Sequence, residues 1–84
     1  MNIHILKTIQ PFFDLTWAGI KDLEVRKNDR DYSAGDLLLL QEYDEALQKY
    51  GGREILVEVT YLLNDVRYCK EGFVIMQCKE LKRI

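Results

Sequence analysis

Five short segments with the patterning of β-strands limit the folds that this sequence can adopt. Residues 3–9, 22–27 and 53–63 alternate apolar with polar residues, which is the two-residue period of a strand. Residues 37–40 are four consecutive leucines, as in a strand that is covered on both faces or closed into a barrel. Residues 73–78 form the fifth segment. A fold dominated by one small sheet is therefore expected.

A single helix is expected after the first strand, at about residues 10–19. Pro11 suits the first helical position because its missing N–H would have no partner inside the helix. Gly19 readily adopts the left-handed conformation that ends many helices. Between them, aromatic and other side chains recur at steps of three and four residues, and this stripe is expected to pack on the sheet. The stripe consists of Phe12, Phe13, Thr16, Trp17 and Ile20.

The strands after the helix are joined by connections of hairpin length, which favours antiparallel pairing. Residues 44–52 and 64–72 are expected to be loops, and the basic tail 79–84 is expected to extend the last strand or fray from it. In the longest strand, Ile55, Val57, Val59 and Tyr61 are expected to share one face. We predict an α+β, mostly β domain spanning 1–84, a small partly closed barrel of about five antiparallel or mixed strands.

Length and composition restrict the function further. At 84 residues the chain has room for one domain, and no apolar segment approaches the roughly 18 residues of a membrane span. The start of the chain lacks a secretory pattern, so a cytoplasmic location is expected. Cys69, Cys78 and the single His4 do not have the spacing of a disulfide framework or a metal site, and no cofactor or metal is expected. The net charge of -2 argues against a broad basic face for duplex nucleic acid.

Residues 19–36 hold the densest mixture of charged side chains in the chain. Within it, Glu24 and Arg26 are next-but-one neighbours on a strand, so they emerge on one face and can pair. The simplest interpretation is a solvated surface ion pair that contributes little to stability. The alternative is a recognition pocket, because such a segment offers many hydrogen-bond donors and acceptors at fixed spacing. The charged residues are Lys21, Asp22, Glu24, Arg26, Lys27, Asp29, Arg30, Asp31 and Asp36.

Several catalytic chemistries have little support in the sequence. No glycine-rich phosphate loop follows a strand, and no serine or cysteine has a histidine partner other than His4. Lys21 follows the expected end of the helix and begins the second strand, so it would lie where helix and barrel meet. A lysine that loses water there could act as a base.

The pattern Gly19-x-Lys21-x-x-Glu24-x-Arg26, placed before a Gly35-Asp36 turn, resembles the signature of the ASCH superfamily. More closely, nearly the whole chain resembles a family of small bacterial and phage proteins catalogued as a domain of unknown function. The segments that carry this second resemblance are His4-x-Leu6-Lys7, Glu24-Val25-Arg26-Lys27-Asn28-Asp29-Arg30-Asp31-Tyr32, Gly35-Asp36, Tyr43-Asp44, Gly52-Arg53-Glu54 and Glu71-Gly72-Phe73-Val74.

The ASCH resemblance implies a PUA-like barrel with a cleft between helix and barrel, lined by Lys21, Glu24 and Arg26. Proteins of this superfamily are generally regarded as modules of RNA binding or RNA metabolism. One branch hydrolyses the acyl amide of N4-acetylcytidine with the signature lysine, a threonine three residues later and a glutamate from a helical insert. Here Glu24 stands at the threonine position, the insert is absent, and Glu71 is the nearest counterpart of the later glutamate.

Three hypotheses follow. The first is a module that binds RNA, a nucleotide or a nucleoside, with bidentate arginine and amide contacts and with Trp17, Tyr32 or Tyr68 for base stacking. The second is a small amidohydrolase of a modified nucleoside such as N4-acetylcytidine, with Lys21 and Glu24 as catalytic residues. The third is a structural or protein-interaction domain. The residues expected to contact a ligand are His4, Lys7, Lys21, Glu24, Arg26, Lys27, Asn28, Arg30 and Tyr32.

Overall fold

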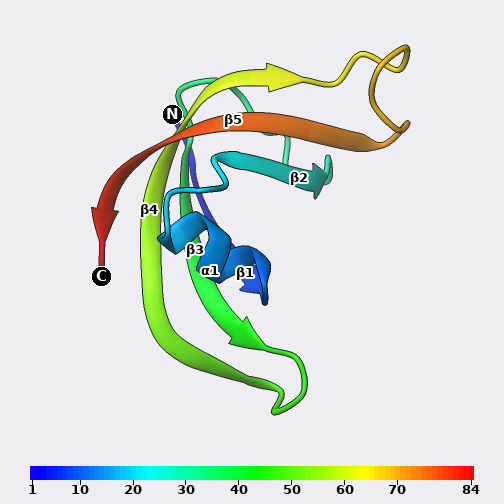
Figure 1. Cartoon of the computed structure of the whole chain (residues 1–84). Helices are drawn as coiled ribbons and strands as arrows, with labels where there is room; N and C mark the ends of the chain where they lie inside the picture. Colours follow the sequence, from blue (N-terminus) through cyan, green and yellow to red (C-terminus); the bar gives the residue numbers. More distant parts are fainter.

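The computed structural model describes residues 1–84, and its five strands form one curled sheet with the order β1-β3-β4-β5-β2 (Figure 1). β1 pairs with β3 in parallel, and the other three pairings are antiparallel. This is the predicted mostly β fold, with mixed strands and one helix after the first strand. The elements are β1 (Ile3–Ile9), α1 (Phe12–Trp17), β2 (Leu23–Lys27), β3 (Leu37–Asp44), β4 (Lys49–Leu63) and β5 (Phe73–Arg83).

The sheet closes only halfway into a barrel, and its two edge strands border the opening. β1 is at one edge and β2 at the other, although they are the first two strands of the chain. The chain passes from one edge to the other through α1, which lies inside the curl and contacts β1 and β3 (Figure 1). No helix of the structure is both long and apolar enough to cross a bilayer.

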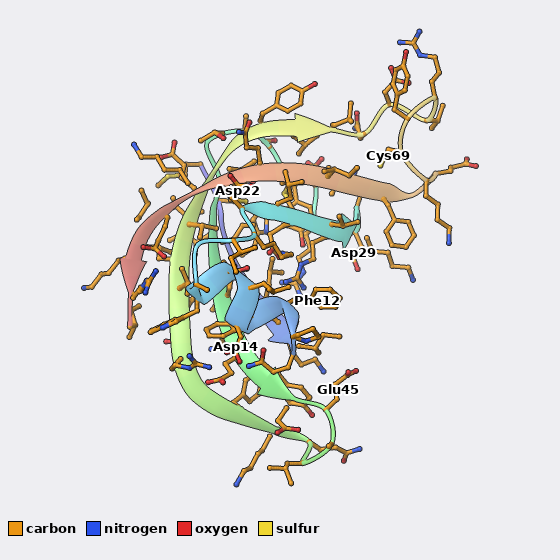
Figure 2. All side chains as sticks on the ribbon, in the orientation of Figure 1. Phe12, Asp14, Asp22, Asp29, Glu45 and Cys69 are labelled. Carbon is orange, nitrogen blue, oxygen red and sulfur yellow. The ribbon has the colours of Figure 1, made fainter.

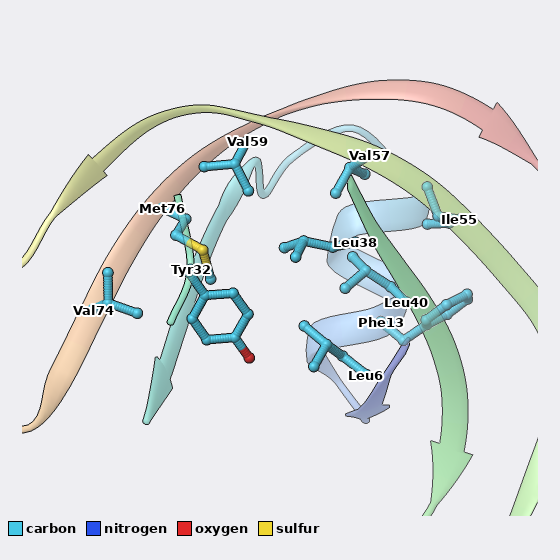
Figure 3. Packing of buried hydrophobic residues seen from close by; sticks show 10 residues of the cluster. All are labelled: Leu6, Phe13, Tyr32, Leu38, Leu40, Ile55, Val57, Val59, Val74 and Met76. Carbon is cyan, nitrogen blue, oxygen red and sulfur yellow. The ribbon is translucent and has the colours of Figure 1, made fainter. Parts of the chain in front are cut away.

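The core fills the concave side of the sheet. Alternate residues of β3 and β4 point inward, so Leu38 and Leu40 meet Ile55, Val57 and Val59, as the two-residue period predicts (Figure 3). Burying these branched side chains contributes most of the driving force for folding, about 1.5–3 kcal/mol for each. The complete cluster is Leu6, Phe13, Tyr32, Leu38, Leu40, Ile55, Val57, Val59, Val74 and Met76.

The helix is shorter than the predicted range of about 10–19. Pro11 precedes the first helical residue instead of occupying that position, and the Gln10 side chain accepts a hydrogen bond from the Asp14 N–H. At the other end the N–H groups of Ile20 and Lys21 both donate to the Leu15 carbonyl. These bonds turn the chain out of the helix, helped by the positive φ of 77° at Gly19.

Three strands are longer than the sequence indicated, and β3 continues past the predicted range 37–40 to Asp44. β4 begins at Lys49 because Tyr50 and Lys49 pair with Tyr43 and Asp44, so the expected loop 44–52 shrinks to a short turn. β5 extends through the basic tail to Arg83, and beyond it Ile84 exchanges two backbone hydrogen bonds with Glu54. The tail therefore extends the strand and does not fray.

Tyr61 does not share the inward face of β4, contrary to the prediction. Its side chain is 58% exposed, whereas Leu62 packs against the core. The pairing register with β5 shifts between Val59 and Tyr61. Such a bulge inserts one unpaired residue and reverses the inward and outward positions beyond it.

Candidate functional site

The gap between the two edge strands, called the seam here, is bridged by side chains from the β2 side. Arg26 on β2 donates from Nη1 to the Lys7 carbonyl at 3.0 Å and from Nη2 to Thr8 Oγ1 at 2.9 Å. Arg30, in the loop after β2, donates to the Ile5 carbonyl at 3.2 Å. Two guanidinium groups thus satisfy backbone carbonyls of β1 that another strand would satisfy in a closed barrel.

Glu24 is buried beside the seam. Its Oε2 accepts a hydrogen bond from Lys21 Nζ at 2.6 Å, and its Oε1 accepts from Arg26 Nε at 3.1 Å and Nη2 at 2.9 Å. Glu24 is 3% exposed, whereas Leu23 and Val25 on the opposite face of β2 are 47% and 60% exposed. The predicted pairing of Glu24 with Arg26 is confirmed, but the pair is not a solvated one. β2 turns its charged face inward.

A cavity of about 320 Å³, called the seam cavity here, opens where these groups meet. Its walls come from β1, the start of α1 and β2, so it lies at the point where the helix and the two sheet edges converge. Glu24 and its two cations provide the polar part, and Ile9, Phe12 and Val25 provide the apolar part. The complete lining is Lys7, Thr8, Ile9, Phe12, Lys21, Glu24, Val25 and Arg26.

The groups around Glu24 differ in how many hydrogen bonds they have left to make. A guanidinium has five N–H bonds, and Arg26 uses four of them on Glu24, Thr8 and the Lys7 carbonyl. An ammonium has three, and Lys21 uses one of them on Glu24. Arg26 is therefore mainly a positioning residue, and of the two cations paired with Glu24, Lys21 has more N–H groups left for a ligand.

A second cavity of about 190 Å³ lies on the other side of Lys21 and Glu24, and Cys78 lines it. Burial raises the pKa of the Cys78 thiol to about 12, and the nearby Glu24 acts in the same direction. The thiol is therefore protonated at neutral pH. Since the thiolate is the nucleophilic form, Cys78 is a packing residue in this state.

A third cavity of about 260 Å³, called the basic cavity here, adjoins the seam cavity, because Lys7 and Arg26 line both. It lies beside the loop that leaves β2, where Figure 2 labels Asp29. Four of its side chains are cationic and one is a carboxylate. The complete lining is Leu6, Lys7, Arg26, Lys27, Asp29, Arg30 and Tyr32.

Seven of the nine predicted ligand residues gather at these two adjoining cavities. Lys7, Lys21, Glu24 and Arg26 line the seam cavity, and the basic cavity adds three more, Lys27, Arg30 and Tyr32. His4 and Asn28 line neither.

His4 is buried under the start of β3. Its Nε2 lies 2.9 Å from Asp36 Oδ2, and its ring packs against Tyr32 with centroids 4.7 Å apart. The same carboxylate accepts the N–H groups of Asn2 and Ser33. The hydrogen bond from His4, followed by those two N–H groups, holds the pKa of Asp36 below its ordinary value. His4 therefore joins β1 to the turn before β3.

The three aromatic residues considered for stacking lie apart. Tyr32 belongs to the core, with its ring between Met76 and Leu6 in Figure 3. Trp17 lies on α1 with the guanidinium groups of Arg53 and Arg83 each 4.9 Å from its ring. Tyr68 is exposed in the loop before β5. The aromatic residue in the seam cavity is Phe12, which the sequence assigned to core packing.

Thr8, Ile9 and Val25 also line the seam cavity without having been predicted. The alternation of β1 placed Thr8 on one face with His4 and Leu6, but nothing in the sequence indicated that β2 would lie opposite. Glu71, the nearest counterpart of the later glutamate in the hydrolase branch, is exposed in the loop before β5 and lines none of the three cavities.

Comparisons with known proteins identify relatives without assigning an activity. Residues 3–78 match the family model described as "Domain of unknown function (DUF3850)", a range that includes both strands of the seam. Over 59 residues the chain is 38% identical to the "Uncharacterized 12.9 kDa protein in GpA 3'region" of Escherichia phage P2. The aligned part covers 70% of this chain and 52% of the phage protein, so the chain spans about half of that relative.

Proposed function

The chain belongs to the family described as a domain of unknown function (DUF3850), and we propose that it binds RNA or a nucleotide by holding one base in the seam cavity. The observation that carries this proposal is the buried carboxylate of Glu24, which Lys21 and Arg26 hold at the wall of an open cavity. Burying a charge is costly unless it is well paired, and a domain that needed only a stable edge strand could have placed an apolar residue there.

The dimensions and lining of the seam cavity suit a planar ligand of this size. Small-molecule sites generally measure about 300–1,000 Å³, so a cavity of about 320 Å³ accommodates one base or nucleoside and no longer segment. Phe12, Ile9 and Val25 line the cavity and form the apolar part of its wall, which suits the face of a base. Bases of single-stranded RNA are commonly recognised in this way, with stacking on one face and hydrogen bonds at the edge.

The polar groups of the cavity match the edge of a base. Glu24 accepts hydrogen bonds, as carboxylates do from exocyclic amines, and Lys21 offers N–H groups to a base carbonyl or ring nitrogen. Arg26 holds Glu24 in place and bridges to β1, so the acceptor is preorganised before a ligand arrives. The site thus presents an acceptor beside a donor.

The resemblance of residues 19–26 to the ASCH signature supports this proposal, because that superfamily is generally regarded as RNA-binding. A small curled sheet with one helix and a cleft beside Lys21, Glu24 and Arg26 is consistent with a PUA-like domain of that type. The residues that match the signature are those that pair with one another at the seam.

A thermal-shift screen against ribonucleosides, nucleotides and short single-stranded RNAs tests the proposal. A ligand present at about 100 times its dissociation constant should stabilise the fold by about 2.7 kcal/mol. Lys21→Gln keeps a donor for Glu24 but removes the charge and the spare N–H groups, so we expect it to weaken binding by about tenfold or more.

Lys79→Gln is the matched control, since Lys79 is exposed on β5, forms no salt bridge and lines no cavity. It should bind the ligand as the unmodified protein does. The proposal fails if no member of the screen stabilises the protein, or if Lys21→Gln and Lys79→Gln bind equally well.

The contact of 2.6 Å between Lys21 and Glu24 at an open cavity favours an amidohydrolase as the second candidate function. Lys21 would activate a water molecule that attacks the acyl carbonyl of a modified nucleoside such as N4-acetylcytidine, which releases acetate and free cytidine. Incubation with N4-acetylcytidine and detection of free cytidine tests this reaction. Turnover no faster than that of Lys21→Ala would remove it.

A further inference from the structure

The basic cavity carries an excess of positive charge in a protein whose net charge is -2. Lys7, Lys27 and Arg30 line it, and none of them forms a salt bridge. The one carboxylate in the lining, Asp29, forms none either. By contrast, Lys21 and Arg26 are both paired with Glu24. The basic cavity therefore has three cations without a carboxylate partner, whereas Lys21 and Arg26 in the seam cavity share the carboxylate of Glu24.

The two cavities are arranged so that one small ligand could occupy both. Lys7 and Arg26 form the wall that they share. The Arg26 guanidinium lies at this boundary with one N–H bond unused, and the Lys7 side chain is exposed. A group attached directly to a ligand in the seam cavity would thus meet Lys7 and Arg26 first, and Lys27 and Arg30 beyond them.

The hydroxyl of Tyr32 adds a neutral donor to the basic cavity. The ring is part of the core (Figure 3), but the residue also lines the cavity, and its hydroxyl forms no hydrogen bond within the protein. Burial raises the pKa of Tyr32, so the group keeps its proton and can donate it in a hydrogen bond.

We propose that the basic cavity is a phosphate subsite, in which Lys7, Lys27, Arg30 and the Tyr32 hydroxyl bind the phosphate of a nucleotide whose base lies in the seam cavity. This inference rests on the proposed function and specifies it: the ligand is a phosphorylated nucleoside, free or within an RNA strand, and not a nucleoside alone. Several N–H and O–H donors around one oxyanion form charge-assisted hydrogen bonds, which are about twice as strong as neutral ones.

The test compares each of the four ribonucleosides with its 3′- and 5′-monophosphate by isothermal titration calorimetry, with inorganic phosphate as a separate probe. We expect at least one monophosphate to bind about tenfold more tightly than its parent nucleoside at low salt. The advantage should shrink as salt rises, because the contacts are exposed charges. Short single-stranded RNA, measured in parallel, shows whether the phosphate belongs to a free nucleotide or to a strand.

Lys27→Gln is the critical variant because Lys27 is exposed and makes no side-chain hydrogen bond or salt bridge, so the fold should not depend on it. Lys27→Gln should remove most of the difference in affinity between the monophosphate and its parent nucleoside, and it should leave the affinity for the nucleoside unchanged. Lys49→Gln is the control, since Lys49 is an exposed lysine in the β3–β4 hairpin that lines no cavity. It should change neither affinity.

The outcomes separate this inference from the proposed function. If a nucleoside binds and its monophosphates bind no more tightly, or if Lys27→Gln keeps the full advantage, the phosphate subsite is wrong and base binding stands. If inorganic phosphate binds and Lys27→Gln abolishes that binding while no nucleoside or RNA binds, the proposed function is wrong and the basic cavity is an anion site. If none of the probes binds, both are wrong.

Discussion

Glu24 is the residue whose burial most affects the seam, because it is the common partner of Lys21 and Arg26. Removing one member of a buried ion pair leaves the other charges without compensation. We therefore expect Glu24→Ala to lower the free energy of unfolding by about 3 kcal/mol, at the lower end for buried pairs since both cations are partly exposed. Urea denaturation followed by circular dichroism measures this loss.

Glu45→Ala is the matched control for Glu24→Ala. Glu45 is an exposed carboxylate in the turn between β3 and β4, at the opposite end of the molecule from Cys69 in Figure 2. Its removal should change the free energy of unfolding by no more than about 0.5 kcal/mol. An equally small change for Glu24→Ala would mean that the ion pair at the seam contributes nothing to stability.

The pairing of Glu24 with Arg26 could be predicted from their spacing, but the direction in which they point could not. The ordinary rule places apolar residues inward, and on β2 it would have buried Leu23 and Val25. The structure buries Glu24 instead, because β2 is an edge strand whose inner face borders a cavity and not the apolar core. Sequence periodicity shows which residues share a face, and the neighbouring strands decide which face is buried.

At the scale of elements, Asp36 ties β1 to β3. His4, the Asn2 N–H and the Ser33 N–H all donate to its carboxylate, and together they hold its pKa below the ordinary value of 3.8. Asp36→Asn should therefore lower the free energy of unfolding at pH 7 by about 1–3 kcal/mol, as expected for hydrogen bonds to a buried charged group. The measurement is urea denaturation at a series of pH values.

The pH dependence follows from the sign of this shift. The unfolded chain takes up a proton at Asp36 near pH 3.8 and the folded protein only at lower pH, so stability is lost as pH falls through that interval. The difference in the free energy of unfolding between the unmodified protein and Asp36→Asn should have its full size above about pH 5 and should shrink toward pH 2. Asp31→Asn, at an exposed carboxylate, should show no such difference. A difference that stayed constant from pH 7 to pH 2 would contradict the assignment to Asp36.

The existence and type of the elements could be predicted from sequence, whereas their ends depended on tertiary contacts. The stripe from Phe12 to Ile20 predicted the helix, but the bonds from Gln10 and to Leu15 set its limits at 12–17. Likewise, the tail 79–84 has no strand pattern, and it becomes part of β5 because β4 lies alongside it. Tyr61 was misplaced because a bulge leaves no signature in simple alternation.

At the scale of the whole molecule, hairpin-length connections predicted that the strands after the helix pair in chain order. This is confirmed for β3-β4-β5, but it is wrong for β2, which pairs with β5 and not with β3. β1 pairs with β3 in parallel across more than thirty positions of sequence, and β2 pairs with β5 across more than forty. Neither pairing is marked by a turn motif. The seam and both of its cavities depend on these two pairings, which is why Thr8 and Phe12 were missed as site residues.

The same topology predicts an uneven distribution of stability. β4 is paired on both sides, whereas β2 is paired only with β5 and is joined to β1 by the side chains of Arg26 and Arg30. We expect the amides of β2 to exchange hydrogen through a partial opening of the seam, with a lower free energy and a weaker urea dependence than those of β4. Native-state hydrogen exchange measured by NMR at increasing urea concentration tests this expectation.

Two variants distinguish a separate opening from global unfolding. Ile55→Val removes a methylene group from the β3–β4 core, so it should lower the opening free energy of β4 amides by about 0.5–1.5 kcal/mol and leave that of β2 amides unchanged. Arg26→Lys removes the guanidinium group whose hydrogen bonds to Lys7 and Thr8 bridge the seam. Because these hydrogen bonds break both when the seam opens and when the whole domain unfolds, the variant should lower the opening free energies of β2 and β4 amides together. If Ile55→Val lowered both strands equally, β2 would open only with the whole domain, and the seam would not be an independent unit.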